Sequence, residues 1–485
     1  MLKRVINLTR MTSERAIIKD YLEGKISFDT DVPMVTIAQP YGSNHIREDI
    51  LGVYRPPTAK KAVLADMTLH KDFSRKKLEI PGFLEAGPRE TLLHNPHEVQ
   101  AAIVTVGGLA PGLHCVIHSI VKRHIYPYGI HQCDGRIYGV YNSYRGLCSL
   151  ANNLVELSTE KTAEWLNTGG AELGIVRYFH EGKRGDVEAI ERMVDQISTN
   201  LQGNEIDILY VLGGDGSLMI AHEIAINNPE CSVVGIPKTM DNDVLWVDQS
   251  FGFDSAVEQA THVINVLYRE AQSTRRICLI ELFGAESGFV AANATLASGY
   301  VDLVLIPEVF TYLEEDQVQD YLNVQMIHIK QRIRLKRRQN PHAVIVVAEG
   351  VGTILEKRRI KINGKKVTRK NFIDVLSNFI EENVQDANRR RVPVFVNQPR
   401  HHIRAVAANS RDHIYCDRLG ALAVDNALAG YTDFMISQWR SEFVLVPLAL
   451  VKEGQKSIPI NGMFWKQVMS STGQPLSPAE VSTND

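Results

Sequence analysis

Short runs of apolar residues recur along the chain from residue 99 onward, and most of them end in glycine or an acidic residue. The runs are 101–108, 208–216, 232–237, 277–284, 301–308, 343–350 and 443–448. Helix-length segments separate them, and continuous apolar runs of this length are typical of parallel strands buried on both faces. The pattern predicts an α/β fold in which helices cover both faces of parallel sheets.

A helix is expected directly after the first run. Pro111 falls in its first turn, and apolar residues follow at helical spacing: Leu113, Val116, Ile117, Ile120 and Val121. The order of strand, Gly107-Gly108 and helix presents free backbone N–H groups to an anion. A tight turn between strand and helix that binds no ligand is the alternative.

The strongest local signal is Gly213-Gly214-Asp215-Gly216-Ser217, between the apolar run ILYVL and the helical run LMIAHEIAI. Glycines let the backbone approach a phosphate, the start of a helix favours negative charge, and an acidic residue there can hold Mg²⁺. This pattern predicts a phosphate and magnesium site. A tight turn with a capping aspartate is the alternative, and the P-loop fingerprint is absent.

The next run ends in Pro237-Lys238-Thr239-Met240-Asp241-Asn242-Asp243. If this segment is extended, Asp241 and Asp243 point to one side and Asn242 to the other. Two neighbouring carboxylates repel unless a metal, a cation or a shared proton compensates. We interpret the pair as functional; the alternative is that both acids cap loops or pair with surface lysines.

Composition narrows the class of protein. The 485 residues carry 53 Lys plus Arg against 56 Asp plus Glu, so no strong field attracts nucleic acid or membrane, and neither is expected as a partner. The six cysteines form no C-x-x-C pair, which argues against a disulfide framework or a zinc site and favours a reducing cytoplasm. The opening, which has no acidic residue before Glu14, is also compatible with a short organelle presequence.

Residues 1–98 mix charges with proline-rich turns and show little periodicity, so we interpret them as an extension that packs on the main body or a subunit interface. Three basic runs, 328–339, 357–370 and 389–391, are interpreted as solvated surface. The first predicts an amphipathic helix, and Asn363-Gly364 in the second predicts a hairpin with a type I′ turn.

Several motifs in order resemble one family. GGDGS, PKTMDND, AEG and a later His-x-x-Arg are similar to the ATP-dependent 6-phosphofructokinases, specifically the long branch of plants, trypanosomatids and some bacteria, over roughly residues 85–475. The resemblance implies two doubly wound α/β domains of the phosphofructokinase type with an N-terminal extension. The nucleotide-binding domain would span 99–260 plus about 404–452, and the sugar-phosphate-binding domain 261–403 plus about 453–485.

The resemblance also implies an activity: phosphorylation of fructose 6-phosphate by ATP in glycolysis, with Mg²⁺, by a cytoplasmic homo-oligomer, either a tetramer or a dimer. Asp241 would be the general base, Asp215 the magnesium ligand, and Arg177 the cation that stabilises the transferring phosphoryl group. The implied ATP-binding residues are Gly108, Arg177, Tyr178, Gly214, Gly216 and Ser217. The implied substrate-binding residues are Thr239, Met240, Asp241, Asp243, Arg276, Phe283, Gly284, Glu349, His401 and Arg404.

The chain departs from the family pattern where cations or polar groups are usual. Ala285 replaces an arginine, Phe395 replaces a basic residue, and His114 and His118 replace Asn and Arg. Nearby candidates for compensation are Arg275, Arg400 and His402. These departures leave a catalytically impaired regulatory subunit open.

The phosphoryl donor is a separate question. Gly216 favours ATP, because pyrophosphate users in this family tend to carry Asp there, where a carboxylate would crowd the α-phosphate of ATP. Lys238 occurs in pyrophosphate enzymes but also in this ATP-dependent branch. A pyrophosphate-dependent enzyme is therefore an alternative.

Overall fold

The computed structural model describes residues 11–36, 42–43, 60–62, 67–176, 187–336, 340–386 and 388–475. The chain forms two compact units. The first combines Met1–Thr239, Asp243–Gly252 and Ala405–Lys456, and the second combines Met240–Asn242, Phe253–Arg404 and Ser457–Asp485. The domain boundary predicted at residue 260 lies inside helix α9 (Phe253–Thr274), which belongs whole to the second unit.

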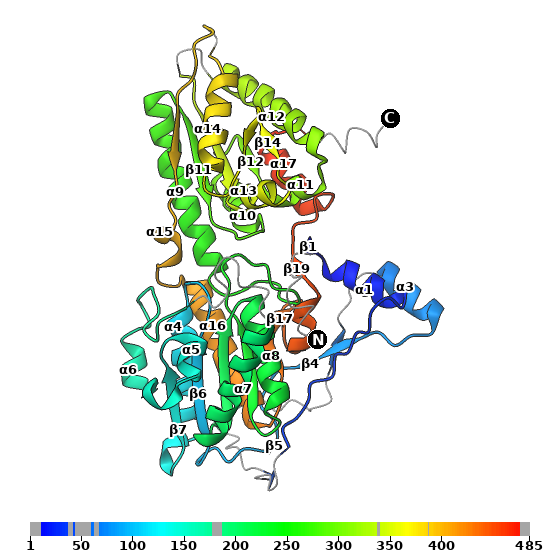
Figure 1. Cartoon of the computed structure of the whole chain (residues 1–485), viewed down its shortest axis with the longest axis vertical. Coiled ribbons are helices and arrows are strands. Elements are labelled where there is room, and N and C mark those ends of the chain that lie inside the picture. Colours follow the sequence, from blue (N-terminus) through cyan, green and yellow to red (C-terminus); the bar gives the residue numbers. More distant parts are fainter. Residues whose placement is uncertain are drawn as a thin grey trace. The chain divides into compact units, whose positions relative to one another are not determined.

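A nine-stranded sheet forms the centre of the first unit (Figure 1). Its middle strands β17, β10, β9, β6 and β7 run parallel to one another. In spatial order the strands are β3 (Lys60–Ala62), β4 (Gly82–Glu85), β18 (Glu442–Pro447), β17 (Phe434–Trp439), β10 (Ser232–Pro237), β9 (Ile208–Gly213), β6 (Gln100–Thr105), β7 (Arg136–Val140) and β8 (Leu154–Glu156).

Helices cover both faces of this sheet. On β6, Ala101 and Ile103 pack with α4 (Leu113–Ile125) and α16 (Ser410–Leu428). Ala102 and Val104 point to the other face and pack with α7 (Val187–Gly203) and α8 (Asp215–Asn227). Because the side chains of β6 alternate between two cores, its four successive inner residues, 101–104, are all apolar. Pro111 was predicted to lie in the first turn of this helix, but it precedes the N-cap Gly112 and so lies just outside α4.

Each of the seven apolar runs overlaps a strand, but the parallel direction predicted for 443–448 is wrong. That run forms β18, which is antiparallel to β17 and to β4. Arg440 and Ser441 connect β17 to β18 and have φ of +54° and +67°. Two successive positive φ values make a hairpin turn of the type I′ kind, which reverses the chain within two residues.

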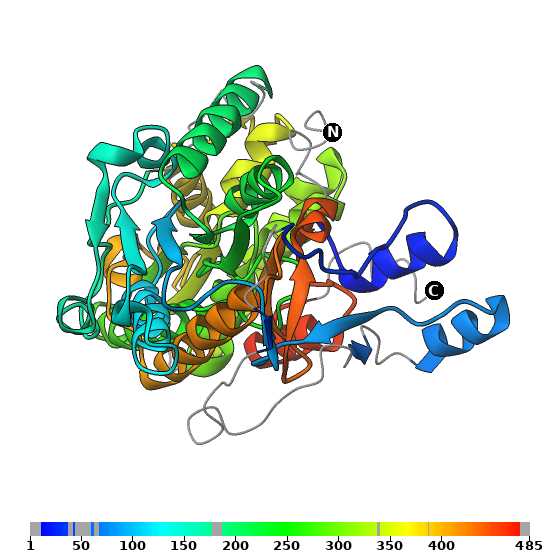
Figure 2. The same cartoon turned by 90° about the horizontal axis from the view of Figure 1, so that it is seen from below.

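The N-terminal extension packs on the first unit. Strands β3 and β4 complete one edge of the nine-stranded sheet. Phe28 and Phe83 lie edge-on to Trp246, with ring centroids 5.2 and 5.7 Å away. Helices α1 (Glu14–Leu22) and α3 (Met67–Lys76) lie side by side at the margin of this unit (Figure 2). Short strand pairs are β1 (Met11–Thr12) with β19 (Gln455–Lys456), and β2 (Gly42–Ser43) with β5 (Thr91–Leu92).

The second unit is built on a parallel sheet in the order β12 (Leu303–Leu305), β13 (Ala343–Ala348), β11 (Ile277–Leu282) and β16 (Val394–Asn397). Besides α9, its helices are α10 (Phe289–Ser298), α11 (Pro307–Tyr312), α12 (Glu315–Leu335), α13 (Gly350–Lys357), α14 (Phe372–Asn383), α15 (His401–Arg404) and α17 (Met463–Thr472). Shorter elements of the first unit are η2 (Ile130–Gln132), α5 (Ser143–Leu147), η3 (Leu150–Asn152), α6 (Thr159–Ala163) and η4 (Leu448–Glu453).

Two surface predictions for the second unit are confirmed. The predicted hairpin is β14 (Lys361–Ile362) and β15 (Lys365–Lys366), with φ of +47° at Asn363 and +73° at Gly364. The basic run 328–339 continues α12 as far as Leu335 and buries Ile329 and Ile333, as an amphipathic helix does. The interpretation as solvated surface is wrong for Arg332 and Lys336, because both form ion pairs with the buried Asp302. Residues 337–339 lie outside the described residues.

Candidate active site

Two glycine turns meet at the carboxyl edge of the nine-stranded sheet. Strands β6 and β9 are parallel neighbours, and the Val106 N–H donates to the Leu212 carbonyl at 2.9 Å. Gly107 has a φ of +94°, and a Cβ added at Gly213 would lie only 2.4 Å from the Cβ of Ser217. Position 107 therefore favours glycine because of its positive φ, and position 213 requires glycine because a side chain there would clash with Ser217.

Lys238 and Ser217 line the same turns. The Lys238 N–H donates to the Gly213 carbonyl at 2.8 Å, and its Nζ donates to the Gly108 carbonyl. A Cβ built at Gly107 would lie 3.6 Å from Lys238 Nζ and 3.8 Å from Ser217 Oγ. Lys238 is buried, so a positive charge, glycine backbone and the N-terminus of α8 converge in one place. This combination favours an anion such as a phosphate.

Asp215 is the first residue of α8, directly after the N-cap Gly214. Its Oδ2 accepts a hydrogen bond from Gln455 Nε2 at 2.6 Å. Among the described residues, no group of three or more His, Cys, Asp or Glu could hold a metal ion. One oriented carboxylate still fits Mg²⁺ that arrives with phosphate oxygens and water as further ligands, which is the usual arrangement in phosphoryl transfer.

The chain approaches the Gly107 turn a second time at residues 174–176. Thr105 Oγ1 donates to the Gly174 carbonyl at 2.8 Å, and the Val176 N–H donates to Ser143 Oγ at 2.8 Å. The Gly107 N–H donates to the Val176 carbonyl at 3.5 Å. The predicted residues Arg177 and Tyr178 follow immediately and lie outside the described residues.

The segment after β10 is a turn, so the alternation expected of an extended segment does not apply. Asn242 has a φ of +55°, which a strand does not adopt. Thr239 Oγ1 donates to Asp243 Oδ1 at 2.9 Å, and the Lys456 N–H donates to the Asp243 carbonyl at 2.8 Å. Thr239 and Asp243 belong to the first unit, whereas Asp241 belongs to the second. The two carboxylates therefore have different surroundings.

The second unit brings four predicted residues together at the carboxyl edge of its sheet. Phe283 and Gly284 follow β11, and Glu349 follows β13, which is the neighbouring parallel strand. The guanidinium carbon of Arg404 lies 3.8 Å from the centroid of the Phe283 ring. A guanidinium over an aromatic face gains cation–π attraction and keeps its N–H groups available at the ring edge.

The charged groups around the Glu349 carboxyl identify its neighbours at this edge of the sheet. Its burial raises its pKa, and the nearby negative charge of Asp241 raises it further, while Arg404 and Arg369 act in the opposite direction. Asp241, Glu349 and Arg404 are therefore close enough to interact within the second unit. A carboxyl group with a raised pKa next to two guanidinium groups is suited to binding the hydroxyl groups of a polar ligand.

Sequence reasoning missed Arg369 and Gln398. Arg369 lies in the basic run that was interpreted as solvated surface, and its side chain is 48% exposed, yet its Nη2 is 3.9 Å from Glu349 Oε2. Gln398 donates to Glu281 Oε2, and burial raises the pKa of that carboxyl. The pairing of β11 with β16 brings Gln398 to Glu281, and the loop before α14 brings Arg369 to Glu349. No motif spacing signals either contact.

Arg276 does not join these residues. It precedes β11, is exposed, and lies at the amino end of the strand, whereas Phe283 follows the carboxyl end. Six strand residues separate them, roughly 20 Å at about 3.3 Å per residue. Phe395 pairs with Cys278 near the same amino end, and His401 is exposed at the start of α15.

Comparison with known proteins identifies the family. A family model described as phosphofructokinase matches residues 100–427. The chain is 36% identical over 405 residues to the ATP-dependent 6-phosphofructokinase of Borreliella burgdorferi, which covers 81% of this chain and 85% of that protein. This chain belongs to the phosphofructokinase family.

Further phosphofructokinases agree. ATP-dependent 6-phosphofructokinase 7 of Arabidopsis thaliana is 32% identical over 87% of this chain and 83% of its own length. The ATP-dependent 6-phosphofructokinase of Trypanosoma brucei brucei is 31% identical over 80% of this chain and 75% of its own. The predicted resemblance to the branch of plants, trypanosomatids and some bacteria is confirmed.

Solved phosphofructokinase structures share the fold. The Saccharomyces cerevisiae phosphofructokinase gives a TM-score of 0.56 at 24% identity, over 73% of this chain and 45% of that one. The pyrophosphate-dependent phosphofructokinase of Nitrosospira multiformis gives a TM-score of 0.60 at 17% identity, over 79% of this chain and 92% of that one. At these identities the likeness establishes the fold alone, and it confirms the predicted α/β class.

The two histidines that depart from the phosphofructokinase pattern hold α4 in place. His114 Nε2 accepts from the Glu172 N–H at 3.1 Å, which leaves Nδ1 protonated toward the carbonyls of Trp165 and Thr168 at 3.2 and 3.3 Å. Burial lowers the pKa of His114, in agreement with a neutral ring. His118 Nδ1 lies 2.9 Å from Thr162 Oγ1. Both histidines are engaged in packing contacts within the first unit.

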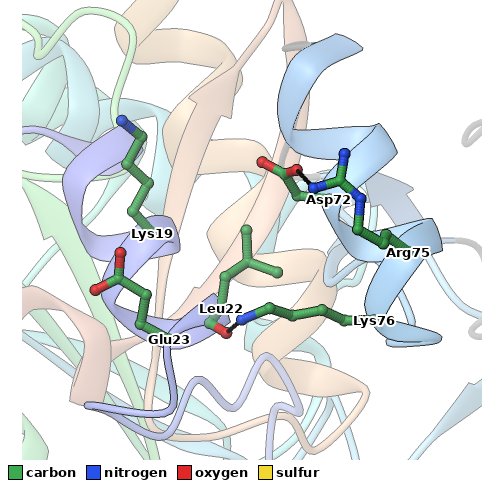
Figure 3. A pocket seen from close by; sticks show the side chains of 6 residues that line it. All are labelled: Lys19, Leu22, Glu23, Asp72, Arg75 and Lys76. Carbon is green, nitrogen blue, oxygen red and sulfur yellow. Dashed lines mark hydrogen bonds and ion pairs between the residues drawn. The ribbon is translucent and has the colours of Figure 1, made fainter.

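A separate cavity of about 220 Å³ opens between α1 and α3 of the extension (Figure 3). On one side of the cavity, Lys76 Nζ donates a hydrogen bond to the Leu22 carbonyl. Arg75 Nη1 lies 3.7 Å from Asp72 Oδ1. The lining residues are Lys19, Leu22, Glu23, Asp72, Arg75 and Lys76. None of them is a residue implied by the phosphofructokinase pattern.

Proposed function

We propose that this protein transfers the γ-phosphoryl group of ATP to the 1-hydroxyl of fructose 6-phosphate, giving fructose 1,6-bisphosphate. The observation that carries the proposal is the meeting of the two glycine turns with buried Lys238 and the start of α8. Relatives that share most of the chain are named ATP-dependent 6-phosphofructokinases. The first unit would bind the nucleotide and the second the sugar phosphate.

In this proposal Gly108, Gly214, Gly216 and Ser217 lie along the nucleotide phosphates, and Arg177 and Tyr178 complete the nucleotide site. Asp215, whose carboxylate accepts a hydrogen bond from Gln455, would hold magnesium. When bound, the metal neutralises charge on the phosphoryl group in transfer. The backbone N–H groups at the start of α8 would stabilise the same negative charge. Because the helix already fixes their orientation, they need not reorganise during the reaction.

Asp241 is the proposed general base. It takes the proton of the 1-hydroxyl while that oxygen forms a bond to the γ-phosphorus. The bond from this phosphorus to the bridging oxygen breaks, and ADP leaves with the electron pair. Arg177 would stabilise the negative charge on the phosphoryl group in the transition state. Thr239, Met240 and Asp243 shape the turn that carries Asp241, since Thr239 and Asp243 are bonded to each other and Met240 is buried.

Glu349, Phe283, Gly284 and Arg404 would bind the sugar phosphate, with His401 following β16. We assign Arg369 to the same site, because its guanidinium reaches Glu349. Arg404 and Arg369 supply two cations at an edge where Ala285 lacks one. Their presence supports an active enzyme over a regulatory subunit.

The donor can be tested directly. With Mg²⁺ and fructose 6-phosphate, the purified protein is expected to turn over with ATP and much more slowly with pyrophosphate, because Gly216 leaves room for an α-phosphate. Lys238 at the Gly108 carbonyl is the observation that keeps pyrophosphate as the second candidate. A coupled assay for fructose 1,6-bisphosphate measures both rates. Faster turnover with pyrophosphate would reverse the donor assignment, and no turnover with either donor would favour the regulatory subunit.

A homo-oligomer is part of the proposal, and Arg276 suggests how a second copy contributes. This residue is at the wrong end of β11 to reach Phe283 of its own chain, so we propose that it completes the site of a neighbouring subunit. Most oligomers of this kind are symmetric, so each chain would then both donate and receive an Arg276.

Mixed oligomers test that exchange. Arg276→Ala and Asp241→Asn are each expected to be nearly inactive alone, but their mixed dimers contain one site with both residues intact. Random mixing would restore about one quarter of the parental activity, since half of the dimers are mixed and each has one of its two sites complete. Co-expressed chains with different affinity tags provide the measurement. No recovery would place Arg276 in the site of its own chain.

We further propose that the protein acts in the cytoplasm. All six cysteines are free, and four of them are buried, as expected in a reducing compartment.

As a separate observation, none of the helices that the structure describes is long and apolar enough to cross a membrane.

A further inference from the structure

Residues 284–288 form a tight turn after β11, and one side chain of this turn contacts the proposed base. The Ser287 N–H donates to the Gly284 carbonyl at 2.7 Å. Ser287 Oγ lies 2.8 Å from the Asp241 carbonyl oxygen and 3.1 Å from the Gly284 carbonyl oxygen. A hydroxyl has one proton to donate, and the shorter distance favours Asp241 as its acceptor. Ser287 is buried, so water does not compete for this bond.

The turn that carries Ser287 is itself held in place. A Cβ at Gly284 would lie 2.4 Å from the Ser287 carbonyl oxygen, so the backbone closes on itself without room for a side chain. At the other end, the Gly288 N–H donates to Glu308 Oε1 at 3.0 Å, and the same oxygen accepts from the Ile458 N–H at 3.1 Å. Glu308 is buried at the start of α11. Three parts of the second unit therefore fix the position of Ser287.

The Asp241 segment belongs to the second unit only over three residues. Met240–Asn242 packs with the second unit, whereas Thr239 and Asp243 on either side belong to the first and are bonded to each other. Asn242 turns the chain back with a φ of +55°. Asp241 thus lies on a short excursion of the first unit's chain, and the Ser287 hydroxyl binds its peptide carbonyl within the second unit.

We propose that Ser287 is a positioning residue for phosphoryl transfer, whose hydroxyl holds the Asp241 peptide to the unit that binds the sugar phosphate. This inference rests on the proposed function. Ser287 acts through Asp241, since its hydroxyl contacts the peptide carbonyl and leaves the carboxylate for the sugar hydroxyl. A general base must stay within hydrogen-bond reach of the proton that it removes. Because the Ser287 hydroxyl fixes the Asp241 backbone to the second unit, the distance from the Asp241 carboxylate to the sugar hydroxyl is set within the unit that binds the sugar phosphate.

Ser287→Ala removes the hydroxyl and adds no bulk. A displacement of about 1 Å at a reacting group can lower a rate about 100-fold, so kcat is expected to fall between about 10- and 100-fold while the KM for ATP stays unchanged. The matched control is Ser298→Ala, which removes a hydroxyl that bonds Asn265 Oδ1 at 2.8 Å at the end of α10 in the same unit. The control is expected to keep the parental kcat and KM.

Hydrogen exchange provides a readout that does not depend on activity. Amides of residues 240–242 are expected to exchange faster in Ser287→Ala than in the parent or in Ser298→Ala. Unchanged exchange would overturn the inference, and so would faster exchange with an unchanged kcat. An equal loss of kcat in both variants would show general destabilisation and also overturn it. If the parent has no kinase activity, the proposed function fails, while the exchange of residues 240–242 still tests the contact.

Discussion

Asp241→Asn is expected to lower kcat by about 10²- to 10⁴-fold, the range that a positioned general base contributes. Asparagine has nearly the same shape but cannot accept the proton of the sugar hydroxyl. ATP affinity should remain near the parental value, because the glycine turns, Lys238 and Asp215 all belong to the first unit. Steady-state rates with fructose 6-phosphate and calorimetric titration with Mg-ATP measure the two effects separately.

The control for this change is Asp195→Asn, which makes the same substitution at an exposed position of α7. It should leave kcat unaltered. Asp241→Asn turnover within a few-fold of the parent would rule out Asp241 as the base and would point to another proton acceptor near Glu349.

Gly216→Asp is expected to raise the KM for ATP by roughly 5- to 1,000-fold. Two like charges about 4 Å apart repel by about 1 kcal/mol in water and about 4 kcal/mol at an effective dielectric constant of 20, and this range converts to that change in affinity. Gly216 lies in the first turn of α8, where an acidic side chain is favourable for the helix itself, so the fold should be retained. Pyrophosphate has only two phosphoryl groups, so no part of it occupies the position of the α-phosphate of ATP. The rate with pyrophosphate should therefore fall less than the rate with ATP.

Gly203→Asp is the matched control, because Gly203 ends α7, is exposed, and a Cβ there would meet no atom within 4 Å. It adds the same charge to the first unit away from the glycine turns. If Gly216→Asp and Gly203→Asp bound ATP equally well, Gly216 would not lie beside the nucleotide. A parallel loss of ATP and pyrophosphate use would indicate damage to the whole phosphate site.

Much of the fold was predictable because helices cover both faces of the central strands, so most positions of these strands are apolar. The 208–216 run illustrates this, since all six residues of β9 are buried. Strand direction was not predictable from such runs, because an apolar run reads the same in parallel and antiparallel strands. For β18 the direction is set by the turn at Arg440-Ser441, which lacks the Asn-Gly signal that made the 361–366 hairpin recognisable.

The same distinction applies to the site. The glycine turns were predictable because local steric needs select glycine within a few residues of a strand end. Ser287 and Asp241 are 46 residues apart in sequence, and Arg369 reaches Glu349 from the loop before α14. Those contacts depend on how strands and loops are arranged in three dimensions. The basic composition around Arg369 also resembled ordinary surface, which concealed its contact with a buried carboxylate.

The position of β17 and β18 in the chain has a consequence for biosynthesis. Both strands belong to the nine-stranded sheet, yet they follow every strand of the second unit's parallel sheet, which is complete at Asn397. On the ribosome, β10 therefore emerges long before its neighbour β17, and its edge stays without that partner while about 200 further residues are made. Open strand edges pair readily with other chains, and long-range pairings form slowly. The nascent first unit should thus depend on chaperones until residue 447 has emerged, after the sheet of the inserted second unit has had time to form.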